Sequence, residues 1–253
     1  MKRHLDHAAH TLMEAGKVTA VSELIKQLDR RQCKIKPLAP QADPLTPAQI
    51  YPRCKPAVLV VAGLYKCPRC TRWHTMLASG VLIDPAGVFL TNYHVVKNTN
   101  NKAIVAMTAD GKVYPVTEVL AASAAEDVAV ARLDTGSRRL AALPIATHAP
   151  VGAPVTVISH PTNRFYLLTA GIVSRYQKAK RANKLVDMMT ITADFGRGSS
   201  GGPVLNDRGA VVGMVASTSS VYYPAKKGKK EQLQMVFKQC IPAAAILKLL
   251  APR

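Results

Sequence analysis

Residues 198–203 of this chain read GSSGGP and lie between two apolar runs. A serine flanked by glycines suits a nucleophile that must stand clear of its own backbone, because Gly198 and Gly201 have no Cβ and let a substrate carbonyl approach the main chain. The amides of Gly198 and Ser200 could then point at one spot beside the Ser200 hydroxyl. Two such preorganised donors form an oxyanion hole, which stabilises the charge that develops in acyl transfer.

The same string also fits a plain turn or a flexible linker, which most Gly/Ser runs are. The residues that follow it argue against a linker. Residues 203–205 are apolar, residues 206–209 read NDRG, and residues 210–215 are apolar again. This pattern predicts a strand, a turn and a second strand.

A serine hydroxyl is a weak nucleophile and needs a base. The best candidate is His94, in LTNYHVV at residues 90–96, which closes an apolar run. A histidine in this setting also fits a satisfied core residue, and both readings stay open at this point.

Asp127, in EDVAVARL at residues 126–133, is the candidate third member. An acid at this position would hold the tautomer of His94 and stabilise its imidazolium. Glu126 is a rival acid, and the alternation of side chains along a strand does not choose between the two.

Together, TNYHVV at 91–96, DVAV at 127–130 and GSSGGP at 198–203 resemble the three signatures of trypsin-like serine peptidases. The order His, Asp, Ser also matches, and neither subtilisins nor α/β-hydrolases share it. The form of the histidine motif and the short interval to the aspartate are closer to the HtrA/Deg peptidases of bacteria. The resemblance covers about residues 55–242.

The resemblance implies a serine endopeptidase that acts on proteins or peptides without a cofactor. It implies His94 as base, Asp127 as the orienting acid and Ser200 as nucleophile, with the amides of Gly198 and Ser200 as oxyanion hole. The alternative is a catalytically weak or inactive protein of this fold that binds polyanions through basic loops.

Two features depart from the family pattern. Ser199 precedes the nucleophile where the family usually has Asp or Asn, so activation by insertion of a new N-terminus is not expected. HtrA proteins carry PDZ domains after the catalytic unit, whereas this sequence ends at Arg253, so the resemblance is to a peptidase without a PDZ domain.

The composition favours an all-β fold. The 253 residues are 48% hydrophobic and only 5% aromatic, and Gly and Pro recur between short apolar runs. The resemblance implies two six-stranded antiparallel β-barrels with the site between them. The predicted strands are 58–65, 76–83, 88–92, 103–108, 113–120 and 128–133, then 154–159, 167–176, 185–192, 203–205, 210–217 and 234–237.

The predicted domains are an N-terminal segment (1–50) and a peptidase domain (51–253), which divides into a first barrel (51–140) and a second barrel (141–253). In the first segment, helical spacing of apolar residues predicts an amphipathic helix over 19–32, followed by a Pro-rich linker. The helix is expected to dock on the first barrel. A closing helix is predicted at 241–250, with Pro242 in its first turn.

The N-terminus shows no signal peptide, because the basic start MKR leads into HLDH rather than an apolar run. The resemblance implies a periplasmic or secreted enzyme. Two alternatives stay open: the chain remains in the cytoplasm, or it begins after a removed export signal. No apolar run approaches the ~18 residues of a membrane span.

Five cysteines are present. Cys67 and Cys70 form a CxxC pair between two predicted strands, with His74 close behind. A structural zinc site needs four ligands. Cys54 is a poor candidate for the fourth ligand, because a whole strand separates it from Cys67 and Cys70. We therefore predict that Cys67 and Cys70 form a local disulfide or a free dithiol. A metal site, with Cys67, Cys70 and His74 as weak candidate ligands, and redox activity are the less favoured alternatives.

The formal net charge of +19 is the second unusual global feature. Two basic clusters stand out, at residues 226–230 and 178–181, and both are predicted to be loops. Solvated loops are the ordinary interpretation, and contact with polyanions is the alternative. The clusters contain Lys226, Lys227, Lys229 and Lys230, and Lys178, Lys180 and Arg181.

The resemblance assigns a specificity pocket with Asp194 at its base and Ala216 and Thr218 in its wall. Asp194 would favour cleavage after Lys or Arg. Thr218 would narrow the pocket, and Arg197 could neutralise Asp194. Both effects favour a substrate with a small apolar residue before the cleaved bond. Cleavage specificity, physiological substrate and oligomeric state are not readable from the sequence.

Overall fold

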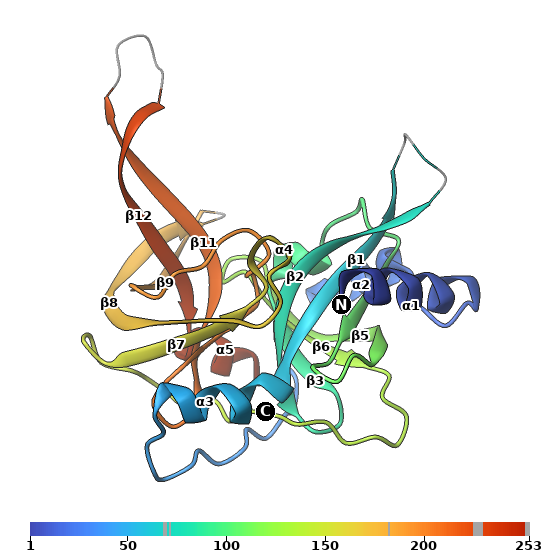
Figure 1. Cartoon of the computed structure of the whole chain (residues 1–253), viewed down its shortest axis with the longest axis horizontal. Helices are drawn as coiled ribbons and strands as arrows, with labels where there is room; N and C mark the ends of the chain where they lie inside the picture. The colour runs from blue at the N-terminus through green and yellow to red at the C-terminus, as the bar shows by residue number, and fades with distance from the viewer. Residues whose placement is uncertain (68–69, 71, 182, 225–229, 251–253) are drawn as a thin grey trace.

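The computed structural model describes residues 1–67, 70, 72–181, 183–224 and 230–250. Its strands form two closed antiparallel barrels of six strands each, so the expected all-β architecture is confirmed (Figure 1). The first barrel has the strand order β1-β2-β3-β6-β5-β4. Its strands are β1 (Val58–Lys66), β2 (Trp73–Asp84), β3 (Val88–Thr91), β4 (Ala103–Met107), β5 (Val113–Ser123) and β6 (Val128–Leu133).

The second barrel has the strand order β10-β11-β12-β9-β8-β7. Its strands are β7 (Pro154–Ser159), β8 (Leu167–Arg181), β9 (Lys184–Ile191), β10 (Pro203–Leu205), β11 (Val211–Pro224) and β12 (Lys230–Pro242). Three of them, β8, β11 and β12, run longer than predicted, because their hairpins continue to pair after the apolar pattern has ended.

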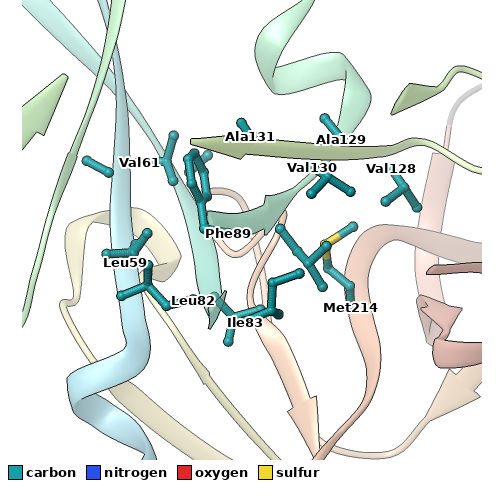
Figure 2. Close-up of a cluster of buried hydrophobic side chains, with 14 of the residues drawn as sticks. Leu59, Val61, Leu82, Ile83, Phe89, Val128, Ala129, Val130, Ala131 and Met214 are labelled. Carbon is teal, nitrogen blue, oxygen red and sulfur yellow. The ribbon is translucent and has the colours of Figure 1, made fainter. Parts of the chain in front are cut away.

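The two barrels share apolar contacts. Figure 2 shows a cluster of first-barrel side chains that Met214, on β11 of the second barrel, joins. Phe89 and Leu82 in this cluster are almost fully buried. Burying one such side chain contributes about 1.5–3 kcal/mol, so the junction is held by packing as well as by hydrogen bonds. The labelled members from the first barrel are Leu59, Val61, Leu82, Ile83, Phe89, Val128, Ala129, Val130 and Ala131.

The N-terminal segment packs on the first barrel, as expected, but its helices differ from the prediction. It contains α1 (Lys2–Glu14), α2 (Val21–Lys26) and the 3₁₀ turn η1 (Gln27–Asp29). The predicted helix over 19–32 is shorter because Ala20 is extended and bridges to Ala103 on β4. Helix α1 was not predicted, since only a narrow apolar stripe marks it; Leu5 and Ala9 from this stripe are buried in the core.

The predicted Pro-rich linker contains a helix, α3 (Pro47–Cys54), which a 3₁₀ turn, η2 (Lys55–Ala57), joins to β1. Thr46 caps α3 in a reciprocal arrangement. The Gln49 backbone nitrogen donates to Thr46 Oγ1 over 3.4 Å, and the Thr46 backbone nitrogen donates to Gln49 Oε1 over 2.9 Å. Pro47 occupies the first helical position, where its missing N–H costs nothing. The signal for this helix was present in the sequence as TPAQ.

The closing helix α5 spans Ala243–Leu250. Pro242 is not in its first turn, as was predicted, but ends strand β12 opposite Gly213. A proline is tolerated at the end of a strand because no ladder N–H is needed there. None of the helices in the described ranges has both the length and the apolar character that a membrane crossing requires.

The basic cluster at 178–181 is not a loop. It belongs to β8 and pairs with β9 as far as Arg181 opposite Lys184. Lys178 also forms an ion pair with Asp187, with 2.6 Å between Nζ and Oδ1. Most of the second cluster (226–229) lies outside the described residues, and Lys230 begins β12. Polyanion contact stays a prediction.

Candidate active site

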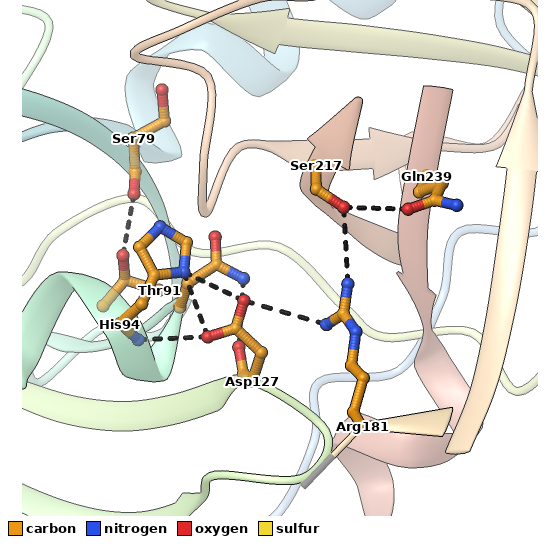
Figure 3. A network of polar contacts seen from close by, with 8 residues as sticks. Ser79, Thr91, His94, Asp127, Arg181, Ser217 and Gln239 are labelled. Atoms are coloured by element: carbon orange, nitrogen blue, oxygen red, sulfur yellow. Dashed lines mark hydrogen bonds and ion pairs between the residues drawn. The ribbon is translucent and has the colours of Figure 1, made fainter. Parts of the chain in front are cut away.

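His94 lies on the short helix α4 (Tyr93–Val96), directly after β3. Its Nδ1 is 2.9 Å from Asp127 Oδ2 and 3.1 Å from Asp127 Oδ1, and its backbone nitrogen donates to the same carboxylate over 3.0 Å (Figure 3). The His94 side chain is 52% exposed and that of Asp127 is 16% exposed. Nδ1–H donation to the carboxylate leaves His94 Nε2 as the acceptor, and no partner occupies it within the described residues.

Asp127 is held by its backbone as well. Residues 124–127 form a turn ahead of β6, and Asp127 has a φ of 57°. Its carbonyl oxygen accepts from Tyr93 N over 3.1 Å and from Asn92 Nδ2 over 3.0 Å. Strand alternation could not choose between the two acids because both stand in this turn. Glu126 has a buried oxygen without a partner, and burial raises its pKa.

The Ser200 loop depends on two glycines. Gly198 has a φ of +97° and Gly201 a φ of +86°, in the region that side chains rarely adopt. A Cβ on Gly201 would lie 2.1 Å from the Ser79 carbonyl oxygen, and one on Gly198 would lie 2.6 Å from the His160 carbonyl oxygen. Both the backbone angle and the available space therefore require glycine at these positions.

Across the described part of the chain, the backbone N–H groups of Gly198 and Ser200 donate no hydrogen bond. The carbonyls of the same two peptides are fixed, since Arg197 O accepts from Thr162 N over 2.7 Å and Ser199 O accepts from Gly202 N over 2.9 Å. The two N–H groups are thus oriented by their tied peptides and remain available to a ligand. No hydrogen bond joins Ser200 Oγ to His94 within the described ranges; such bonds often form only when substrate is bound.

Ser79 on β2 is a site residue that sequence reasoning missed. Its nitrogen donates to Ser200 O over 2.7 Å, and its carbonyl accepts from Thr91 Oγ1 over 3.0 Å. With the bond that the Ser79 hydroxyl donates to Gly198 O over 3.0 Å, these contacts fasten the second barrel's loop to the first barrel. The available signal was a polar residue inside the otherwise apolar run LASGVLI at 77–83.

His160 is a second residue that the sequence did not single out. It is fully buried, with Nε2 3.1 Å from Leu59 O, and Nδ1 accepts from Tyr166 N over 3.0 Å. Burial lowers the pKa of His160 to about 4, so its ring is neutral at physiological pH. The His160 carbonyl oxygen lies close to Gly198, so this histidine supports the Ser200 loop and does not contact the groups that could react.

Arg181, from the basic cluster at 178–181, reaches the candidate site. Its Nη1 is 3.9 Å from Asp127 Oδ2, and its Nη2 donates to Ser217 Oγ over 3.3 Å. Ser217 in turn donates to Gln239 Oε1 over 3.0 Å, and Figure 3 shows the whole chain of contacts. A guanidinium from the second barrel thus faces the carboxylate that orients His94.

A cavity of about 210 Å³ opens beside Ser200. Asp194 does not line it: its carboxylate pairs with the ammonium of Lys238, which lowers the pKa of Asp194. Lys238, rather than Arg197, is therefore the cation that balances this acid. The cavity is lined by Phe195, Gly196, Arg197, Ser200, Val215, Ala216, Ser217 and Thr218.

Cys67, Cys70 and His74 gather at the end of the β1–β2 hairpin, with their ligand atoms all within 4.8 Å of one another. Cys67 and Cys70 are close, as expected, and no disulfide joins them. The contact with His74 lowers the pKa of Cys70 to about 7. Cys54 does not belong to this group; it is the buried last residue of α3, and burial raises its pKa to about 11.

Comparison with known proteins gives a consistent result. The trypsin-like peptidase domain model matches residues 78–214, which is more than half of the chain. Protease Do-like 1, chloroplastic, of Arabidopsis thaliana is 28% identical over 153 residues, 58% of this chain and 34% of its own length. The mitochondrial serine protease HTRA2 of Drosophila virilis is 28% identical over 140 residues, 54% of this chain and 33% of its own length.

The match spans about a third of the length of these curated relatives. The family model covers the part of β2 that contains Ser79, and it covers the segments that carry His94, Asp127 and Ser200. The two closed barrels and the likeness to relatives named as proteases agree with it, and we conclude that this chain belongs to the trypsin-like peptidase family.

Proposed function

We propose that this chain is a serine endopeptidase that hydrolyses peptide bonds through an acyl-enzyme. The observation that carries the proposal is the arrangement around Ser200. The second barrel presents this hydroxyl beside two unused amides, and the first barrel presents an imidazole fixed by Asp127. Family membership and the names of the relatives support the same reaction class.

In the proposed reaction, Ser200 Oγ attacks the scissile carbonyl carbon while His94 Nε2 takes the hydroxyl proton. The amides of Gly198 and Ser200 receive the oxygen that becomes negative, and Asp127 stabilises the imidazolium. His94 then gives its proton to the leaving amine, and the acyl group stays on Ser200. Water, deprotonated by the same histidine, releases the acid product and restores the serine.

The proposed substrates are unfolded proteins and peptides with a small apolar residue before the scissile bond. Val215 and Ala216 give the cavity an apolar wall, and Thr218 narrows it. Asp194 would be needed for recognition of Lys or Arg, but Lys238 already neutralises it. A library of peptides with mass-spectrometric readout of the cleaved bonds tests this specificity.

The activity test uses an unfolded protein substrate and a serine-reactive phosphonate. Ser200→Ala should lower kcat by at least about 10⁴-fold with little loss of stability, because removal of the nucleophile abolishes the covalent route. Ser219→Ala, an exposed serine on β11, is the matched control and should retain activity. A folded wild-type protein that neither cleaves the substrate nor takes up the phosphonate at Ser200 would refute the proposal.

A further inference from the structure

The end of the β1–β2 hairpin brings two thiols and an imidazole to one point. Cys70 Sγ is 2.9 Å from His74 Nε2, and the ligand atoms of Cys67, Cys70 and His74 all lie within 4.8 Å of one another. Among the described residues this is the single group of three or more His, Cys, Asp or Glu side chains that converge in this way. It lies outside the residues proposed to carry the peptidase reaction.

We infer that Cys67, Cys70 and His74 form a zinc site at the end of this hairpin, with a water molecule as fourth ligand. Zinc binds thiolate sulfur at about 2.3 Å and imidazole nitrogen at about 2.0–2.1 Å, which places tetrahedral ligand atoms about 3.5–3.8 Å apart. The observed cluster reaches this geometry with small side-chain shifts. His74, four residues after Cys70, is the third protein ligand of this site, and Cys54, a poor fourth ligand on sequence grounds, is not part of the group.

The ligands are positioned before any metal binds. Antiparallel pairing sets Tyr65 opposite His74 and Lys66 opposite Trp73. The Tyr65 ring lies 5.6 Å from the His74 ring, and the Lys66 ammonium lies 5.0 Å from the Trp73 ring, so both cross-strand pairs are in contact. These contacts orient the His74 imidazole, as neighbours of metal-binding histidines commonly do.

The charge of the site also favours zinc. Two thiolates and a neutral imidazole carry a charge of −2, which one Zn²⁺ cancels. The neighbouring residues Lys66 and Arg72 are basic, so they favour the thiolate forms of the two cysteines. They also repel cations, so a metal ion binds here only if it bonds strongly to thiolates. Thiolate and imidazole ligands in a tetrahedral set select zinc over magnesium or calcium, which prefer oxygen.

A metal at this point would fix a wall of a second cavity. The same hairpin contributes Tyr65, Thr75 and Met76 to a cavity of about 350 Å³ that Gly198 also lines. A bound metal would join Cys67 and Cys70, which precede β2, to His74 on β2. The open end of the hairpin would then fray less, and the cavity wall formed by Thr75 and Met76 would be more ordered. Ordering of the hairpin is therefore a measurable consequence of binding that does not depend on peptidase activity.

The test is titration of the reduced, metal-free full chain with Co²⁺ and Zn²⁺. Co²⁺ should give thiolate charge-transfer absorption and the d–d bands of a tetrahedral site, saturating at one ion per chain, and Zn²⁺ should displace it. Cys70→Ser and His74→Ala should each weaken zinc binding by more than about 100-fold, since they remove ligands rather than their supports. Cys33→Ser and His7→Asn, which alter a thiol and an imidazole elsewhere, are the matched controls.

Hydrogen exchange provides a second readout. Zinc should slow exchange of the amides at residues 73–77 in the wild type and leave His74→Ala unchanged. The inference is overturned if Co²⁺ gives no thiolate absorption, if the control variants lose binding as much as the ligand variants, or if one ion binds per two chains. Circular dichroism spectra that match the wild type ensure that the losses do not reflect unfolding.

Discussion

The two sides of the cleft are built differently. On the first-barrel side, His94 follows β3 and Asp127 precedes the neighbouring strand β6, and three hydrogen bonds join the two residues within this one barrel. On the second-barrel side, the Ser200 loop keeps its shape through positive φ angles at Gly198 and Gly201 and through contacts with Ser79, which lies across the cleft. His94 is thus positioned within one barrel, whereas Ser200 and the neighbouring amides are positioned by the junction of the two barrels.

Among variants that leave His94, Asp127 and Ser200 in place, Gly198→Ala has the largest expected effect. The new Cβ would lie 2.6 Å from the His160 carbonyl oxygen at a φ of +97°, so the peptide that offers the Gly198 amide must turn away. Loss of one oxyanion donor lowers kcat by about 100- to 1000-fold. Steady-state kinetics on a short peptide measure this. Gly196→Ala is the control, since a Cβ there meets nothing within 4 Å, and equal losses in both variants would contradict the argument.

Acid should loosen the barrel junction before it affects other parts. The pKa of His160 falls from 6.5 to about 4 on burial, so the unfolded chain binds this proton more readily than the folded one. Stability contributed by the neutral ring is complete above pH 6.5 and is lost as the pH falls toward 4, by about 3 kcal/mol in total. Urea unfolding at pH 7 and at pH 4.5 measures the difference.

In that experiment His160→Asn should be less stable than the wild type at pH 7 but should lose less stability on acidification. His7→Asn, which changes an exposed histidine on α1, should keep the wild-type pH dependence. An unchanged pH dependence in His160→Asn would assign the acid sensitivity to other groups.

Ser79→Ala tests whether the first barrel holds the Ser200 loop. It removes the hydroxyl that donates to Gly198 O over 3.0 Å and that accepts from His160 N over 3.3 Å. Each neutral hydrogen bond contributes about 0.5–1.5 kcal/mol, so we expect about a 10-fold fall in kcat with KM nearly unchanged. A fall in stability without any change in kcat would show that Ser79 serves the fold and not the loop.

The smallest expected effect belongs to Arg181→Gln, which removes a cation 3.9 Å from Asp127 Oδ2. With that charge gone, the Asp127 carboxylate keeps its contacts with His94 but loses one ion pair, so kcat/KM should shift downward by less than about threefold, in line with the ~0.2–1 kcal/mol of such a pair. Arg175→Gln changes the same charge at an exposed position of β8 and controls for the net charge. A shift of equal size in both variants would remove the specific role of Arg181.

Prediction from the sequence succeeded where the signal is local. The runs that became β6, β7 and β10 have the predicted bounds, since their apolar residues and flanking turns lie within a few positions. The prediction was wrong where partners from elsewhere decide the structure. Ala20 is extended because it bridges to Ala103, and residues 178–181 are a strand because β9 pairs with them.

The sequence by itself determined the all-β class, the order of the three motifs and the family resemblance, which implied the two-barrel architecture, because glycines, turn residues and apolar alternation act over short distances. Only the tertiary structure paired Asp194 with Lys238 and brought Ser79, His160 and Arg181 to the junction. Ser79, His160 and Arg181 make contacts across the barrels, at separations such as the 119 positions between Ser79 and Gly198. Chain closure over such distances is set by the packing of the whole molecule, which no local pattern encodes.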